Sequence, residues 1–219
     1  MAAGPETAPE RQRDAERTRT EILDVATEEF SDRGLAGARV DEIAAKTRTT
    51  KRMLYYYFGS KQGLYLAVLE RAYQGIRALE QGLDVEHLHP TAALRALTDL
   101  TFDHHEAHPA FIRLVSIENI HHAENLRTSP ILDGLAAPAV DQLGRILERG
   151  RAAGLFRDDV DALDVHIVIS AFCIFRTANR HTFQAIFGRD MLDPVDRERY
   201  RRMLGDLVVE YLTAHVGRA

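Results

Sequence analysis

Residues 47–61, TRTTKRMLYYYFGSK, contain the side chains of this chain that are best suited to bind an anion. Two threonines precede Lys51 and Arg52, and three consecutive tyrosines follow, which cannot all point the same way. Lysine and arginine neutralise phosphate groups, whereas the hydroxyls of threonine and tyrosine donate hydrogen bonds to phosphate oxygens without adding charge. The segment therefore predicts contact with a nucleic-acid backbone.

The distribution of charge supports this interpretation, although the 219-residue chain has a formal net charge of −5. Between Arg33 and Lys61 there are seven basic residues and only two acidic residues, Asp41 and Glu42. Such asymmetry within a chain is more informative than its average. One region is expected to face an anion, and the remainder is acidic.

The elements that position this segment are predicted from apolar spacing and capping residues. A first helix is expected from about Glu16 to Arg33, ended by Gly34, and a second is expected in RVDEIAAK, ending near Lys46. A third begins after Thr50, whose side chain is a good N-cap, and Ser60 caps the fourth. The apolar stripe of the first helix comprises Ile22, Val25, Ala26 and Phe30.

The third helix is predicted to have two different faces. Leu54, Tyr57 and Phe58 share an inward face. The outward face carries two i, i+4 pairs, Lys51 with Tyr55 and Arg52 with Tyr56. Two short helices joined by a tight connection form a helix-turn-helix, whose second helix enters the major groove of DNA. The alternative from spacing alone is a solvated helical hairpin whose basic face has no function.

From Arg19 to Glu70 the order of these features resembles the DNA-binding domain of the tetracycline-repressor (TetR) family. The segments that carry the resemblance are FSDRG, VDEIAAK and TKRMLYYYFGSKQGLYLAVLE, and the aromatic tail followed by Ser-Lys is the most diagnostic. The resemblance implies that residues at the turn and at the start of the third helix read DNA. It implies phosphate binding by the tyrosines and by the lysine that begins the fourth helix. Matched to this sequence, the DNA-binding residues are Thr49, Thr50, Lys51, Arg52, Tyr55, Tyr56, Tyr57 and Lys61.

Three arginines depart from the family pattern. Arg48 stands where relatives commonly carry glycine in the turn, and Arg52 stands where they often carry a small residue. A side chain as long as that of Arg52 can bind a guanine edge with two hydrogen bonds, worth about 1 to 3 kcal/mol of discrimination. Arg39 replaces the usual capping threonine of the second helix and is expected to bind phosphate instead. Arg39 and Arg48 complete the predicted DNA-binding set.

Beyond Leu83 the sequence predicts helices only. They are expected at about 91–107, 109–123, 128–153, 161–187 and 194–216, with no alternating strand pattern. We therefore expect an all-α protein of about nine helices, with an N-terminal three-helix helix-turn-helix domain and a larger C-terminal helical domain for ligand binding and dimerisation. The expected boundaries are a disordered arm at 1–14, the DNA-binding domain at 15–62 and the C-terminal domain at 63–219.

The helix expected at 161–187 is apolar nearly all round at first, and the helix at 194–216 carries an apolar stripe, so both must be covered. In the TetR family such helices pair with their copies in a second chain as a four-helix bundle. A homodimer would present two reading helices to half-sites about 34 to 36 Å apart. The competing interpretation is that both helices are internal, and an intermediate one is that each has an inward face and a face toward the partner.

Five histidines in FDHHEAHPAF and IENIHHAE allow two further interpretations. His104 and His108 are four residues apart and could bind zinc with a third ligand from His121, His122 or Glu118. Because His108 precedes a proline, it more simply marks a helix end. We predict no metal site and no cofactor, and we keep a zinc-responsive regulator of the same fold as the alternative function.

By resemblance, an effector pocket is expected within helices four to eight. Its candidate residues are Phe102, His105, Phe111, Leu114, Val115, Glu118, Asn119, His122, Phe172, Phe175, Arg176 and Asn179. A buried guanidinium at Arg176 would need an anion, supplied by Glu118 or by a ligand carboxylate. A solvated arginine at the edge of a helix is the simpler alternative.

Other features narrow the function class. Cys173 is the single cysteine, in an apolar setting typical of a buried hydrophobe, and no disulfide framework is possible. No secretory signal or membrane-spanning run is present, so we expect a cytoplasmic protein without a membrane partner. No motif for nucleophilic, phosphate-transfer or zinc-protease catalysis is found, which makes an all-α enzyme the remote alternative. The expected function is a ligand-responsive dimeric repressor with a double-stranded palindromic operator and a small-molecule effector as partners.

Overall fold

The computed structural model describes residues 8–134 and 136–214, and in these ranges it contains helices and no strand. The prediction of an all-α fold is confirmed. The chain forms two compact units. The N-terminal unit contains the residues up to Arg71 together with Arg113–Leu126, and the C-terminal unit contains Ala72–Ile112 and the residues from Arg127 onward. The first unit is therefore longer than the predicted domain 15–62 and includes a segment from the middle of the chain.

The N-terminal unit begins with α1 (Ala8–Gly37), whose helical dihedrals are interrupted at Gly34 with φ 65°. This left-handed residue, at the predicted terminator, breaks the helix because glycine alone adopts such an angle without strain. Residues 8–14 are helical and not the disordered arm that we predicted, in keeping with an ion pair one turn apart between Asp14 and Arg17. The rest of that arm, residues 1–7, lies outside the described residues.

Three further helices complete this unit up to Arg71, namely α2 (Val40–Lys46), α3 (Lys51–Phe58) and the first half of α4 (Lys61–Gly82). They begin and end close to the predicted positions. The core forms between the apolar stripe of α1 and residues from α2, α3 and α4, and Phe30 meets Tyr65 edge to face at a centroid distance of 5.0 Å. Its fully buried members include Ile22, Ala26, Phe30, Ile43, Leu54, Leu64, Tyr65, Val68 and Leu114.

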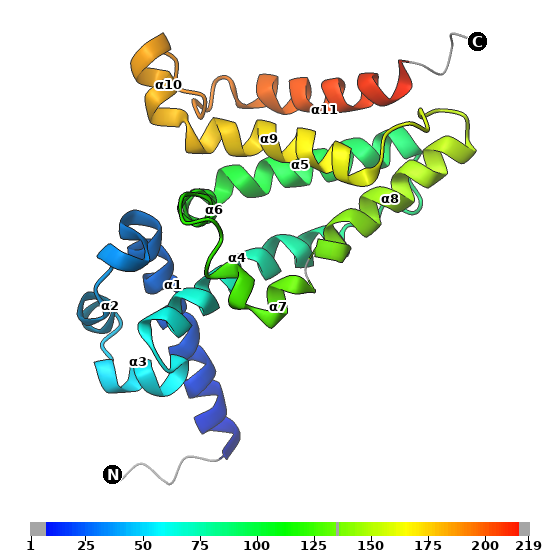
Figure 1. Cartoon of the computed structure of the whole chain (residues 1–219). Coiled ribbons are helices and arrows are strands. Elements are labelled where there is room, and N and C mark those ends of the chain that lie inside the picture. The colour runs from blue at the N-terminus through cyan, green and yellow to red at the C-terminus, as the bar shows by residue number, and fades with distance from the viewer. Residues whose placement is uncertain (1–7, 135, 215–219) are drawn as a thin grey trace, which may run out of the picture. The chain divides into compact units, whose positions relative to one another are not determined.

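Beyond α4 the helices are more interrupted than predicted (Figure 1). After α5 (Pro90–Ala107) and α6 (Pro109–Ile120), the expected helix at 128–153 is a 3₁₀ turn (Leu126–Thr128), α7 (Pro130–Asp133) and α8 (Ala136–Ala152). The expected helix at 161–187 is divided at Asn179 into α9 (Ala162–Ala178) and α10 (Arg180–Phe187), which meet at a bend of 68°. The last helix is α11 (Arg197–Thr213).

The core of the C-terminal unit lies among α5, α8, α9 and α11. Cys173 is 2% exposed within it, and burial raises the pKa of its thiol to about 12, so the prediction of a buried hydrophobe is confirmed. Helix α9 turns Val165 and Ile169 inward and leaves Leu163 and Ile167 exposed. The interpretation that this helix is wholly internal is therefore wrong, and its pairing with a second chain stays a prediction.

No single helix among the described residues is long and apolar enough to cross a membrane. Only the bent pair of α9 and α10 satisfies the criteria of length and composition, and α9 is part of the core described above.

Candidate functional site

The turn between α2 and α3 is held by backbone and threonine contacts. Thr47 is buried and donates its hydroxyl to the carbonyl of Ile43, and the amide of Thr49 donates to the carbonyl of Ala44 at 3.2 Å. Arg48 adopts φ 51°, a left-handed conformation that costs an L-residue about 1 to 2 kcal/mol. This angle gives a physical reason for the glycine that the family pattern carries here.

Two predicted N-caps are confirmed. The hydroxyl of Thr50 accepts a hydrogen bond from the amide of Met53 at 3.3 Å, and that of Ser60 accepts one from the amide of Gly63 at 2.9 Å. These bonds satisfy amides that have no partner within α3 and α4.

The start of α2 is capped by a hydrogen bond that the sequence did not predict. Arg39 makes no side-chain cap, and its amide instead donates to the buried carboxylate of Glu29 at 3.2 Å. Glu29 lies on α1, is 4% exposed, and also pairs with Arg33 at 3.5 Å and Lys46 at 3.6 Å. It thus joins α1 to both ends of α2 and leaves the Arg39 guanidinium exposed, 3.9 Å from Glu42.

The faces of α3 agree with the prediction. Leu54 is 1% exposed, and Tyr57 and Phe58 pack against the core of the unit. Tyr56, by contrast, is 78% exposed and Tyr55 is 39% exposed. Of the ten predicted DNA-binding residues, seven are exposed, namely Arg39, Arg48, Thr50, Lys51, Arg52, Tyr55 and Tyr56, whereas Thr49, Tyr57 and Lys61 are half-buried.

The lysines and arginines among the ten predicted DNA-binding residues differ in their partners. Lys51 pairs with Asp41 on α2, at 3.2 and 3.3 Å to the two carboxylate oxygens, and Lys61 donates to the carbonyl of Ala36 at 3.2 Å. Within the described ranges, Arg48 and Arg52 form no ion pair or side-chain hydrogen bond. Arg52 is therefore the cation of α3 that is available without breaking an existing contact.

A close approach fixes the end of α3 against the start of α4. A Cβ placed on Gly63 would lie 2.1 Å from the carbonyl oxygen of Phe58, where no atom fits. Only glycine permits this arrangement, and the sequence analysis gave Gly63 no role because glycine near the start of a helix is not diagnostic by itself.

The twelve predicted effector-pocket residues are divided between the two units. Leu114, Val115, Glu118, Asn119 and His122 belong to the N-terminal unit, and the other seven belong to the C-terminal unit. Glu118 is 1% exposed and accepts hydrogen bonds from the Tyr65 hydroxyl and the Asn125 amide, each at 2.9 Å. Its carboxylate is therefore used inside the N-terminal unit.

Arg176 has a different partner from the one that we predicted. Its guanidinium donates to Glu106 on α5 at 3.0 Å and to the carbonyl of Met191 at 2.8 Å, and it lies over the Phe102 ring at 4.2 Å. The pairing with Glu118 is therefore wrong, as is the alternative of a solvated arginine, because Arg176 is 3% exposed. The reason is that Glu106 and Arg176 lie on adjacent core helices.

His104 and His105 of α5, and His108 at its C-cap, are held by ring stacking and by backbone contacts. The rings of His104 and His108 lie 4.1 Å apart at 25°, and His108 donates from Nδ1 to the carbonyl of His104. Nδ1 of His105 donates to the carbonyl of Thr101 at 2.8 Å. In residues 8–134 and 136–214, no three His, Cys, Asp or Glu side chains are grouped to hold a metal ion.

Burial of two of these histidines is expected to make the free energy of unfolding depend on pH. Burial is the largest cause that lowers the pKa of both His104 and His105 to about 4, and the charge of Arg77 adds to it. The ordinary value is 6.5, so the unfolded chain binds more protons than the folded chain between pH 6.5 and 4. The free energy of unfolding should therefore fall with decreasing pH through this window, by about 1.4 kcal/mol per pH unit for each histidine.

Urea unfolding between pH 7 and 4.5 measures this slope. Because neither ring nitrogen of His104 has a hydrogen-bond partner among the residues that the structure describes, His104→Leu should keep the fold and reduce the slope by the share of one histidine. His87→Leu, at an exposed position, is the control and should leave the slope unchanged. A slope that His104→Leu does not alter would contradict the assignment.

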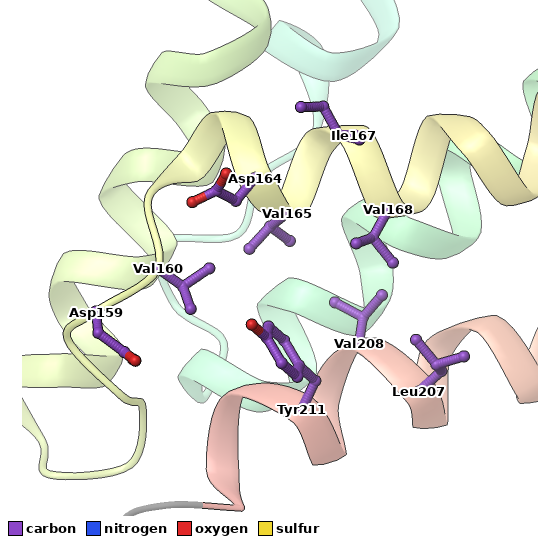
Figure 2. Close-up of a pocket in the computed structure, with 9 residues that line it drawn as sticks. All are labelled: Asp159, Val160, Asp164, Val165, Ile167, Val168, Leu207, Val208 and Tyr211. Atoms are coloured by element: carbon purple, nitrogen blue, oxygen red, sulfur yellow. The ribbon is translucent and has the colours of Figure 1, made fainter.

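Described residues of the C-terminal unit line a hollow at each of the two following places. One, of about 460 Å³, separates the start of α9 from the end of α11, and in Figure 2 Val168 of α9 points toward Val208 of α11. Its wall is mostly apolar and contains none of the predicted pocket residues. The lining residues are Asp159, Val160, Asp164, Val165, Ile167, Val168, Leu207, Val208 and Tyr211. The other, of about 550 Å³, lies along α5 beside His104 and Arg201.

Two family models match the chain. The model described as "Bacterial regulatory proteins, tetR family" matches residues 22–68, and the model described as "Tetracyclin repressor-like, C-terminal domain" matches residues 90–208. The first match contains α2 and α3 with the exposed residues described above.

Individual relatives agree with these matches. The HTH-type transcriptional repressor NicS of Pseudomonas putida is 35% identical over 202 residues, which are 92% of this chain and 95% of the relative. The repressor SCO4008 of Streptomyces coelicolor is 35% identical over 49% of this chain and 53% of its own length. Among solved structures, the putative transcriptional regulator SCO4942 of Streptomyces coelicolor has a TM-score of 0.68 and 28% identity, and the match covers 89% of this chain and 98% of that one.

Proposed function

The chain belongs to the TetR family of bacterial regulatory proteins, which are transcriptional regulators and not enzymes, and we propose that it is a ligand-responsive dimeric repressor of a palindromic operator. The observation that carries the proposal is the exposed outer face of α3, where Arg52 has no partner among the described residues. We also propose that the protein acts in the cytoplasm, where its DNA partner is found.

Contacts to DNA are assigned by exposure and chemistry. Arg52 reads a base edge in the major groove, and Thr49 and Thr50 lie beside it at the start of α3. Tyr55 and Tyr56 donate to phosphate oxygens from the next turn of the helix. Phosphate contacts by other side chains complete the proposed interface, namely those of Arg39, Arg48, Lys51, Tyr57 and Lys61.

Dimerisation is proposed to use the outward faces of α9 and α11. These faces expose large apolar side chains that a single chain leaves uncovered, and the apolar hollow of Figure 2 opens between them. The exposed set comprises Leu163, Ile167, Val168, Phe175, Met203, Leu207 and Tyr211. A two-fold axis through this bundle would place two copies of α3 on successive turns of one face of DNA.

An effector site is proposed within the C-terminal unit beside His105 and Phe111. Their rings lie 5.7 Å apart edge to face, and Tyr73 meets Phe111 at 5.2 Å, which gives an aromatic wall with a neutral imidazole. The effector would relieve repression by binding the DNA-incompetent state more tightly than the DNA-bound state. Phe172 and Asn179 of the same unit remain candidates, whereas Glu118 and Arg176 already have partners.

Selection of binding sites from a pool of randomised duplexes tests this function. The wild-type protein should enrich two inverted half-sites about 10 base pairs apart centre to centre. Arg52→Ala should lose preference at one position of each half-site, worth about 1 to 3 kcal/mol, because only that side chain reads the base. The control is Arg145→Ala, which removes the same charge from an exposed position in the C-terminal unit and should leave the preference intact.

Two outcomes would contradict the proposal. Enrichment of no sequence by the wild-type protein would exclude operator binding, and enrichment of single, asymmetric sites would exclude the dimer. An Arg52→Ala protein that retains every preference would remove that residue from base reading.

A further inference from the structure

The first lysine of the reading helix is engaged by a carboxylate from the preceding helix. Lys51 Nζ lies 3.2 Å from Oδ1 and 3.3 Å from Oδ2 of Asp41. Both side chains remain about half or more exposed, at 49% for Lys51 and 65% for Asp41. The pair therefore lies on the surface at the start of α3, where a phosphate group would have to approach.

This carboxylate is unusual in its setting. Asp41 and Glu42 are the only acidic residues between Arg33 and Lys61, a segment that contains seven basic ones. Asp41 occupies the first turn of α2, where the unpaired amides of the helix favour a negative charge. Its carboxylate thus lies between the first turn of α2 and Lys51, and it faces the same anion as the surrounding cations.

We propose that Asp41 competes with DNA phosphate for Lys51 and thereby weakens binding to DNA of every sequence, so that DNA without the operator is bound too weakly to compete. This inference rests on the proposed function. Any duplex must displace the carboxylate from Lys51 or accept a negative charge beside a phosphate, at a free-energy cost that is the same for all sequences. At the operator, base contacts from Arg52 offset that cost. Other sequences make no such contacts, so the protein's affinity for them remains low.

A purely structural role is a weaker explanation of the pair. Exposed ion pairs contribute about 0 to 1 kcal/mol to folding. The turn is also held independently, by the buried Thr47, by the amide of Thr49 and by the cap at Thr50. Removal of the Asp41 charge should therefore leave the fold intact and change mainly the electrostatics of the reading surface.

Asp41→Asn is the test, with a duplex of random sequence about three helical turns long as the probe. Fluorescence anisotropy between about 50 and 200 mM salt gives the dissociation constant and its salt dependence. The variant should bind the random duplex about threefold to tenfold more tightly. Its salt slope should be steeper by about 0.9 for each bound subunit, or about 1.8 for a dimer, because each Lys51 becomes free to neutralise one more phosphate.

Asp32→Asn is a matched control in the same unit. Asp32 is 64% exposed and pairs with Arg113 at 3.5 Å, so the substitution also removes one negative charge from an exposed ion pair. Because Arg113 is not among the proposed DNA-binding residues, the slope should stay at the wild-type value. A slope that increases equally in both variants would overturn the inference in favour of net charge alone.

The Lys51→Gln background separates the mechanism from general repulsion. If Asp41 acts by occupying Lys51, Asp41→Asn should steepen the slope in the wild-type background and leave it unchanged in Lys51→Gln. Equal increases in the two backgrounds, or none in either, would overturn the proposal. Failure of the wild-type protein to bind any duplex would instead count against the proposed function.

On the operator selected from the randomised pool, Asp41→Asn should gain the same factor in affinity as on random DNA, because the cost of displacing the carboxylate does not depend on sequence. The ratio of the two dissociation constants, which measures specificity, should therefore stay at the wild-type value while both affinities increase. A ratio that changes would mean that the Asp41 contact depends on the base sequence, and would overturn the inference of a sequence-independent cost.

Discussion

Gly63→Ala is expected to weaken binding to operator and random DNA by at least about tenfold, although position 63 lies outside the reading surface. The added Cβ would lie 2.1 Å from the carbonyl oxygen of Phe58, a backbone atom that cannot rotate away. The end of α3 must therefore move from α4 by about 1 Å or more, which is enough to break hydrogen bonds that tolerate only a few tenths of an ångström. Anisotropy titration measures the loss directly.

Gly75→Ala is the matched control on the same helix. A Cβ at Gly75 has open space around it, and replacing glycine by alanine inside a helix stabilises it by about 0.5 to 1 kcal/mol. This variant should bind DNA normally and unfold at a slightly higher urea concentration. Wild-type affinity in Gly63→Ala, with circular dichroism showing a folded protein, would mean that the close approach does not position α3.

Glu106→Ala should destabilise the C-terminal unit by about 3 kcal/mol. The variant leaves the guanidinium of Arg176 buried without its carboxylate, and the Nε of Arg176 already has no hydrogen-bond partner in the described part of the chain. Removing one member of a buried ion pair is costly because the remaining charge is neither solvated nor compensated. Arg197, whose Nε lies 3.0 Å from Glu106, loses a contact as well. Urea denaturation gives the change in the free energy of unfolding.

An exposed carboxylate in the same unit provides the comparison. Glu86 is 59% exposed and pairs with Arg145 at 3.6 Å, so Glu86→Ala should change stability by less than about 1 kcal/mol. The double variant Glu106→Ala, Arg176→Met should recover most of the loss, because the orphaned charge is then absent. Equal costs for Glu106→Ala and Glu86→Ala would show that Arg176 is solvated in solution.

The reading surface could be predicted from sequence because its determinants are local. The caps at Thr50 and Ser60 act within three residues, and the division between Leu54 inside and Tyr56 outside follows from the helical repeat alone. The family resemblance then assigned functions to positions that periodicity had already placed on the outer face. Those functional assignments remain predictions.

Other features depended on contacts between residues distant in sequence. Arg176 is paired with Glu106 because α5 and α9 pack together, which spacing along the chain could not reveal. The importance of Gly63 is apparent only when the Phe58 carbonyl has a position, and the break at Asn179 interrupts an apolar run that periodicity reads as continuous. Pairing of Asp41 with Lys51 likewise requires the angle between two helices.

The N-terminal unit is discontinuous in sequence, since Arg113–Leu126 belongs with the residues up to Arg71. This segment supplies the buried Leu114 and the carboxylate that accepts the Tyr65 hydroxyl. A chimaera that transplants residues 1–71 onto another regulator would therefore lack the side chain of Leu114 in its core. It would also leave the hydroxyl of Tyr65 without its acceptor, Glu118. Exchange of operator specificity between relatives, by design or by recombination, should succeed when Arg113–Leu126 is transferred together with residues 1–71. It should otherwise require a recipient that already has equivalents of Leu114 and Glu118.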